Sequence, residues 1–369
     1  MITTNKNNFF NSARNLLEQA KKEEDYEKKY FLLLSYKSIL TFLHCEERID
    51  FSKLLNIMET YKDNIFLWKT LIGFYRNCLK VHIFESNNEL FTIFDKLVKL
   101  PTDYIETKDI LSMVKSFYGN LDEEIYGSFI DFVGDSNNTI FLSNNYLNRN
   151  NKDYSINGFS VTSEFGINKY LLINNENNHL TYTTLIHELA HAITSSKEID
   201  HSDVYFNPYE EIESLFIEMI ALFEGMKNDD SLLFDYYMMK FLDSNLFELK
   251  SIYKQWVLIK EWQNNDFVVD KKYFDSINTY GITKKKYDEL CGFDFFECVP
   301  YLNSMRVVLR LFNIYKNDKK TAIELYKKIS YGNISDKVNA INSIKNIDPV
   351  SEVVDIQNKV LSRINKRHL

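Results

Sequence analysis

The feature that most constrains the fold of this chain is its shortage of residues that interrupt helices. Only 10 Gly and 4 Pro occur among 369 residues, whereas a sandwich or barrel of many short strands needs such residues at its many turns. Hydrophobic residues make up 45% of the chain, which allows a sizeable buried core. We therefore predict a globular, mainly α-helical fold.

Hydrophobic spacing changes along the chain. From about Ser12 to Val133, apolar residues recur at the spacing of amphipathic helices. Short β-type runs separated by Asn-rich turn segments then follow, at 139–142, 158–162 and 170–173. These runs predict a small sheet.

Helical spacing resumes near residue 180 and continues to the carboxyl end. Interruptions are expected near Pro208, Asn228, Gly281 and Pro300. The sequence thus predicts an amino-terminal helical region at 1–135 and a second region at 136–369 with the small sheet and the later helices, unless the two form one continuous domain.

Charge and hydropathy exclude several classes of partner. The formal net charge is −8, so no global positive field attracts nucleic acid. The amino terminus, Met1–Asn11, is polar and has no apolar signal core, and the apolar run Phe31–Leu34 is too short to span a bilayer. We expect neither nucleic acid nor a membrane as partner, and a cytoplasmic location.

The run His187-Glu188-Leu189-Ala190-His191 carries the clearest chemical signal. His187 and His191 are four residues apart, so on a helix their imidazoles project from one face and can share a metal ion. The neighbouring residues are mostly apolar, and buried ionisable groups would be costly there unless they served a metal. The pattern predicts one Zn²⁺ per chain.

A catalytic zinc needs a third protein ligand and an open position for water. The acidic residues Glu210, Glu211, Glu213 and Glu218 open a second predicted helix. We predict Glu211 as the ligand because apolar residues follow it at spacings that bury the same face. His201 and Asp203 in the intervening segment are alternatives.

Two further carboxylates are assigned around the metal. Glu188 follows the first histidine ligand directly, so it lies beside the metal and can take a proton from a zinc-bound water. Glu218 stands two turns after Glu211 on about the same face. It is either a partner that orients one of the histidines or a surface carboxylate.

Three stretches resemble the oligoendopeptidase F and thimet oligopeptidase family of zinc metallopeptidases. They are the glycine-containing stretch Gly158 to Asn174 before the zinc helix, the pattern Glu211-x-x-Ser214-x-x-x-Glu218, and the closing helices from Pro300 to Ile364. The resemblance covers roughly the last 215 residues. It implies a mostly helical peptidase with a substrate cleft that hydrolyses short peptides.

The chain departs from that family in two respects. It is markedly shorter than typical members, and the segment Cys291 to Pro300 lacks the His and Tyr residues with which members stabilise the tetrahedral intermediate. Tyr301 and Tyr280 are the candidate oxyanion donors here. Tyr301 fits equally well as a packed aromatic residue at the start of a helix.

The run that contains Tyr170 and Leu172 has the alternating pattern of a strand with an unpaired edge. We expect an extended peptide substrate to add to it as a neighbouring strand. Tyr170 and Leu172 are therefore predicted substrate-binding residues.

Three alternative functions remain open from the sequence. The same site could serve a dedicated protease that cuts one protein or precursor peptide, such as a toxin or maturation peptidase. A thermolysin-like peptidase shares the spacing between His191 and Glu211 but expects Asp where this chain has Leu215. The third alternative is a catalytically inactive, zinc-containing protein that binds peptides. The oligomeric state does not follow from the sequence.

Overall fold

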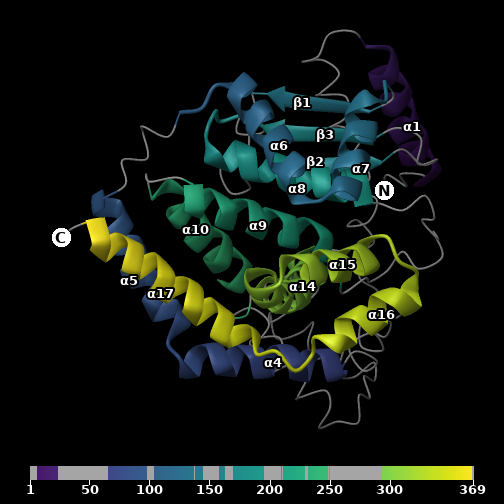
Figure 1. Cartoon of the computed structure of the whole chain (residues 1–369). Coiled ribbons are helices and arrows are strands. Elements are labelled where there is room, and N and C mark those ends of the chain that lie inside the picture. Colours follow the sequence, from purple (N-terminus) through teal and green to yellow (C-terminus); the bar gives the residue numbers. More distant parts are fainter. Residues whose placement is uncertain are drawn as a thin grey trace, which may run out of the picture.

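Helices dominate the computed structural model of this chain (Figure 1). The structure describes residues 6–23, 65–97, 104–136, 138–143, 158–162, 169–194, 209, 211–228, 232–247, 249 and 293–367. Before the sheet lie α1 (Lys6–Lys22), α4 (Ile65–Lys80), α5 (Ile83–Leu97), α6 (Thr107–Leu121) and α7 (Glu123–Gly134). After it lie α8 (His179–Thr194), α9 (Ile212–Asn228), α10 (Leu233–Phe247), α14 (Phe293–Asn317), α15 (Lys319–Ser330), α16 (Ile334–Ser343) and α17 (Pro349–Arg367). The mainly α fold class is confirmed.

A small sheet lies at one end of the molecule (Figure 1). Its strands are β1 (Thr139–Ser143), β2 (Gly158–Thr162) and β3 (Lys169–Asn174), which coincide with the β-type runs of the sequence. The spatial order is β1-β3-β2, with β1 parallel and β2 antiparallel to β3.

The strand predicted to receive the peptide is the central one. In the register of β3, Leu172 lies between Phe141 of β1 and Phe159 of β2. A strand that is paired on both sides has no edge for another chain, so the expectation that a peptide adds to the strand with Tyr170 and Leu172 is wrong. Contact of these two residues with a substrate stays a prediction. Within the described residues, β2 is paired on one side only.

The helix with the histidine motif, α8, is packed between the sheet and α9. Asn178 starts it, since its side-chain Oδ1 accepts the backbone N–H of Thr181 at 3.1 Å. The Lys169 ammonium donates to the carbonyl of Ala192 in the last turn, where a cation also opposes the helix dipole. Contacts at both ends therefore fix the axis of α8.

Buried apolar side chains form one contiguous core. It extends from Trp68 in α4 to Ile364 in α17 and includes Phe216 of α9 and Phe312 of α14. This core crosses residue 135, as expected for one continuous domain, and the division at 135 stays a prediction.

The helix break predicted near Pro300 is wrong. α14 continues through Pro300 from Phe293 to Asn317. Proline in a helix interior costs about 3 kcal/mol of helix stability. We infer that the packing of α14 against α9, α15 and α17 offsets this cost. By contrast, α9 ends at Asn228, where the sequence predicted an interruption. Gly281 lies outside the described residues.

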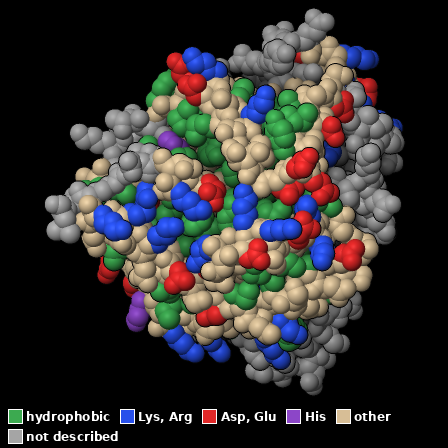
Figure 2. Space-filling model, in the orientation of Figure 1, with side chains coloured by type: hydrophobic (Ala, Val, Ile, Leu, Met, Phe, Trp, Pro, Cys, Tyr) green, Lys and Arg blue, Asp and Glu red, His purple; other side chains and the backbone are tan. Residues whose placement is uncertain are grey.

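The surface carries both signs of charge. Basic and acidic side chains both occur across the face in view (Figure 2). In the part of the chain that the structure describes, no helix is long and apolar enough to span a bilayer.

Candidate metal centre

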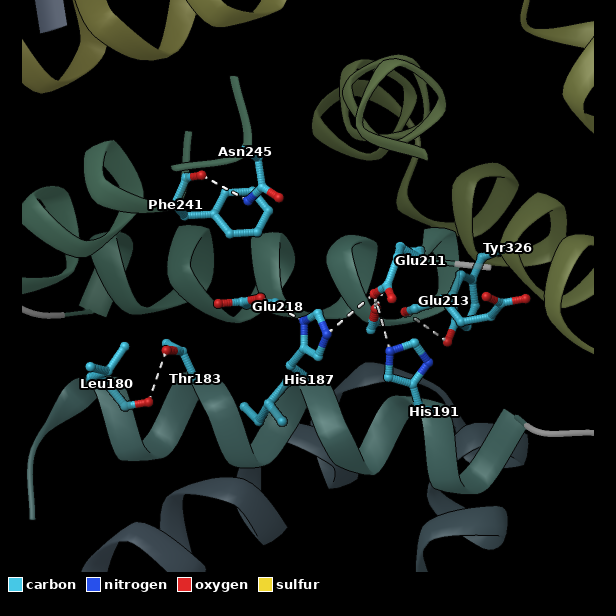
Figure 3. Close-up of polar contacts among 12 residues, drawn as sticks. Leu180, Thr183, His187, His191, Glu211, Glu213, Glu218, Phe241, Asn245 and Tyr326 are labelled. Atoms are coloured by element: carbon cyan, nitrogen blue, oxygen red, sulfur yellow. Dashed lines mark hydrogen bonds and ion pairs between the residues drawn. The ribbon is translucent and has the colours of Figure 1, made fainter. Parts of the chain in front are cut away.

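Two imidazoles and one carboxylate converge between α8 and α9 (Figure 3). His187 and His191 lie one turn apart on α8, and Glu211 directly precedes the first residue of α9. One ligand atom from each of the three residues lies within 4.8 Å of the others. The structure thus brings together the three residues predicted to bind zinc.

The two separations from Glu211 to the imidazoles match a tetrahedral zinc site. Glu211 Oε2 lies 3.4 Å from His187 Nε2 and 3.2 Å from His191 Nε2. Zinc bonds to nitrogen and oxygen of about 2.0–2.1 Å require ligand atoms roughly 3.3 Å apart in a tetrahedron. The donor set of two imidazoles and a carboxylate is also one that catalytic zinc uses. The residues therefore fit this metal.

Glu218 orients the first imidazole. His187 Nδ1 lies 2.9 Å from Glu218 Oε2, so the Nδ1–H donates to this carboxylate. The bond leaves Nε2 of His187 directed toward Glu211. A carboxylate on the far nitrogen of a histidine ligand is a common feature of zinc sites, because it fixes the ring and raises its basicity. Of the two roles considered for Glu218, the geometry favours the orienting one.

The electrostatic environment favours a cation. Burial disfavours the charged imidazole of His187, but the Glu211 and Glu218 carboxylates outweigh it and raise the pKa of His187 well above its ordinary value. The pKa of His191 is raised in the same way, chiefly by Glu211. Carboxylates that stabilise a proton on these rings would equally stabilise a metal ion between them.

The Glu211 carboxylate is buried and held in place. Ser214 Oγ donates to Glu211 Oε2 at 3.0 Å from the first turn of α9. Burial alone would raise the pKa of Glu211, but the adjacent imidazoles of His187 and His191 hold that pKa far below its usual range. Glu211 is therefore an anion at neutral pH, as a metal ligand must be.

The structure separates Glu211 from the neighbouring acidic residue Glu213. Glu213 Oε1 pairs with Lys337 Nζ of α16 at 3.2 Å, and the two side chains are 11% and 21% exposed. This carboxylate already has a cationic partner away from the three-residue group. Glu210, His201 and Asp203 lie outside the described residues.

Glu188 follows His187 directly on α8 and lies close to β2 of the sheet. It is buried and lines the same cavity as His187. A Cβ added to Gly158 of β2 would lie 3.2 Å from Glu188 Cγ and only 2.6 Å from Thr184 Cγ2. Glycine therefore lets β2 pass directly next to the predicted catalytic base.

A cavity of about 250 Å³ reaches this centre at His187. Its lining includes His187, Glu188 and Glu218 together with Tyr301, one of the two predicted oxyanion donors. Tyr280, the other, lies outside the described residues, as do the side chains of Tyr170 and Leu172. The sequence interpretation missed one set of lining residues, which comes from α10 and consists of Tyr237, Lys240, Phe241, Ser244 and Asn245. Their helical spacing is visible in the sequence, but it gave no reason to place α10 at this cavity.

The sequence matches no protein-family model, and no curated protein is significantly similar to it. The fold is similar to that of several solved structures. A protein from Chlamydophila abortus, assigned as a peptidase, superposes with a TM-score of 0.56 at 14% identity, covering 94% of this chain and 63% of that one. A protein from Bacillus anthracis, assigned as an oligoendopeptidase F, gives a TM-score of 0.52 at 13% identity, covering 93% of this chain and 68% of that one.

A third structure, also assigned as oligoendopeptidase F, gives a TM-score of 0.50 at 14% identity and covers 96% of this chain. This chain spans 63% of the length of the Chlamydophila abortus protein. These similarities show the fold of the chain, whereas its chemistry has to be inferred from the residues of the site. The chain has an oligoendopeptidase F-like fold, as its sequence resemblance predicted.

Proposed function

We propose that this protein is a zinc-dependent peptidase that hydrolyses peptide bonds in short peptides. One observation carries the proposal: Glu211 Oε2 lies at zinc-site distances from Nε2 of both His187 and His191, and Glu188 lines the same cavity as His187. The similar fold of the proteins assigned as peptidases supports the proposal. We infer on the same grounds that the chain is a divergent relative of the oligoendopeptidase F family.

His187, His191 and Glu211 would hold the zinc, and a bound Zn²⁺ supplies Lewis acidity that polarises the scissile carbonyl and makes water more acidic. Glu188 is the general base. Its carboxylate accepts a proton from the attacking water and then delivers that proton to the nitrogen of the leaving amine. Glu218 holds the His187 ring through the Nδ1–H bond, so that Nε2 keeps its lone pair for the metal.

A hydroxyl donor is needed where negative charge develops on the carbonyl oxygen. Tyr301 lies in the lining of the cavity, in the third turn of the long helix α14, and we assign it this role. Tyr280 is the second candidate from the sequence. Tyrosine keeps its proton at neutral pH, so it donates without any change of charge on the enzyme.

The substrate would lie along β2. This strand has one unpaired side within the described residues, and its first residue, Gly158, lines the cavity. An extended peptide that pairs with a sheet edge gains main-chain hydrogen bonds without regard to its side chains. β2 thus replaces β3 in the account of peptide binding.

The test is the substitution Glu188→Gln, which keeps the size of the side chain and removes its basicity. The variant should bind zinc like the wild type and lose at least about 100-fold in peptide turnover, since general-base catalysis contributes 10²–10⁴-fold. Glu89→Gln, an exposed residue of α5, is the matched control and should turn over peptides like the wild type. Undiminished turnover in zinc-loaded Glu188→Gln would refute the assignment. Stoichiometric zinc in the wild type without cleavage of any peptide would instead favour a binding protein.

A further inference from the structure

One face of α10 forms a wall of the cavity that the mechanism above does not use. The residues on this face follow one another at helical spacing i, i+3, i+4, i+7 and i+8, and they are Tyr237, Lys240, Phe241, Ser244 and Asn245. Leu180 and Thr183 of α8 line the same cavity (Figure 3). A substrate in the cavity would contact the α10 face.

Aromatic residues anchor this wall. Tyr237 and Phe241 are buried, at 7% and 6% exposed. The Tyr237 ring stacks on His179 of α8 with centroids 5.9 Å apart. Lys240 and Ser244, by contrast, are exposed. The buried aromatic residues thus hold α10 in place, while Lys240 and Ser244 on the same face are accessible to a ligand.

Lys240 is the one Lys or Arg in the described lining of the cavity. The other formally charged side chains of that lining are Glu188 and Glu218, and Glu218 already accepts the His187 Nδ1–H. The described part of the chain offers Lys240 no hydrogen-bond or ion-pair partner, whereas Lys227 and Lys337 are paired with Glu224 and Glu213. The lysine ammonium carries three donors, and these are available to a ligand in the cavity.

We propose that Lys240 is a specificity residue that binds a carboxylate of the substrate peptide, and this inference rests on the proposed function. The carboxylate comes either from an Asp or Glu side chain or from the free carboxyl terminus. Both present the same acceptor to the ammonium. The Ser244 hydroxyl, one turn further along the same face, is a second donor for that group.

The expected size of the preference follows from the exposure of Lys240. An ion pair at an exposed site contributes modestly because water and salt screen it. We expect a peptide with the carboxylate to bind about two- to fivefold more tightly than its neutral analogue. The preference should shrink as ionic strength rises.

The experiment measures binding in the full-length, zinc-loaded Glu188→Gln background, so that no peptide is consumed. Matched peptides carry Glu or Gln at one position at a time, and each is made with a carboxyl-terminal acid or amide. Affinities are compared for Lys240, Lys240→Met, Lys240→Arg and Lys240→Glu. The control is Lys115→Met, an exposed lysine of α6 that is outside the cavity lining.

The proposal predicts a carboxylate preference that Lys240→Met abolishes, Lys240→Arg retains, Lys240→Glu reverses and Lys115→Met leaves intact. A preference at one Glu position identifies a side chain as the source, and a preference for acid over amide identifies the carboxyl terminus. The proposal is overturned if acid and neutral peptides bind equally, if Lys240→Met keeps the preference, or if no peptide binds. Hydrolysis assays on the Glu188-containing chain separate the two claims: selective binding without cleavage refutes the peptidase, and cleavage without selectivity refutes the role of Lys240.

Discussion

Removing the Glu218 carboxylate should weaken zinc binding without unfolding the protein. The His187 Nδ1–H donates to Glu218 Oε2 at 2.9 Å, and the two side chains are only 13% and 16% exposed. A charge-assisted hydrogen bond with so little solvent contact contributes about 1.5–3 kcal/mol. That free energy corresponds to a roughly 10- to 100-fold change in an equilibrium constant. Loss of such an outer partner typically costs a metal site a factor of about the same size.

Two substitutions separate the contribution of the Glu218 charge to zinc affinity from the contribution of its hydrogen bond. Glu218→Ala removes both and should weaken zinc affinity by about 10- to 100-fold. Glu218→Gln keeps a neutral acceptor for the Nδ1–H, so a loss of about fivefold is expected, because neutral hydrogen bonds are roughly half as strong. Glu224→Gln, on the same helix but bonded to Tyr315, should bind zinc like the wild type.

The assay is competition for zinc against a chromogenic chelator of known affinity. Thermal unfolding of the zinc-free variants shows whether each has retained its fold. If folded Glu218→Ala binds zinc within twofold of the wild type, Glu218 does not support the metal through His187, and the reasoning from the 2.9 Å contact fails.

Three further predictions concern the elements that hold the site. Gly158→Ala puts a methyl group 2.6 Å from Thr184 Cγ2, so it should destabilise the fold by about 1–3 kcal/mol and reduce kcat. Urea unfolding and peptide turnover test this, and an unchanged free energy of unfolding would contradict the close approach of β2 to α8. Lys337→Met leaves the Glu213 carboxylate, 11% exposed, without its partner and should lower the free energy of unfolding by about 2 kcal/mol. The control Lys345→Met should lower it little in the same urea titration. Equal losses in the two variants would show that the ion pair does not stabilise the fold. Tyr118→Phe removes the buried bond from its hydroxyl to the Ile186 carbonyl and should cost about 1 kcal/mol of unfolding free energy; stability equal to the wild type would show that this bond does not support α8.

Local signals in the sequence account for much of the fold and for the metal-binding group. The spacing of His187 and His191 depends only on the helix that contains them, so one turn of α8 brings both rings together. The short runs at β1, β2 and β3 were recognisable from their own composition. Glu211 was predictable because it directly precedes a long apolar segment, which forms α9 and is buried over most of its length.

Features that depend on distant parts of the chain were not predictable. The central position of β3 in the sheet follows from its pairing with both β1 and β2. The residue pattern within 170–173 does not indicate how many neighbouring strands this strand has. Glu213 finds its partner Lys337 at a separation of 124 residues. The continuation of α14 through Pro300 likewise reflects packing against other helices, and the wall formed by α10 depends on how that helix crosses α8 and α9.

The central claim is that zinc held by His187, His191 and Glu211 drives peptide hydrolysis. The most direct measurement incubates the purified, zinc-loaded chain with a diverse mixture of short peptides and sequences the products by mass spectrometry. Parallel samples contain a chelator, or a chelator followed by added zinc. We expect internal cleavage that the chelator abolishes and added zinc restores. Cleavage that persists without metal, or zinc-loaded protein that leaves every peptide intact, would contradict the central claim.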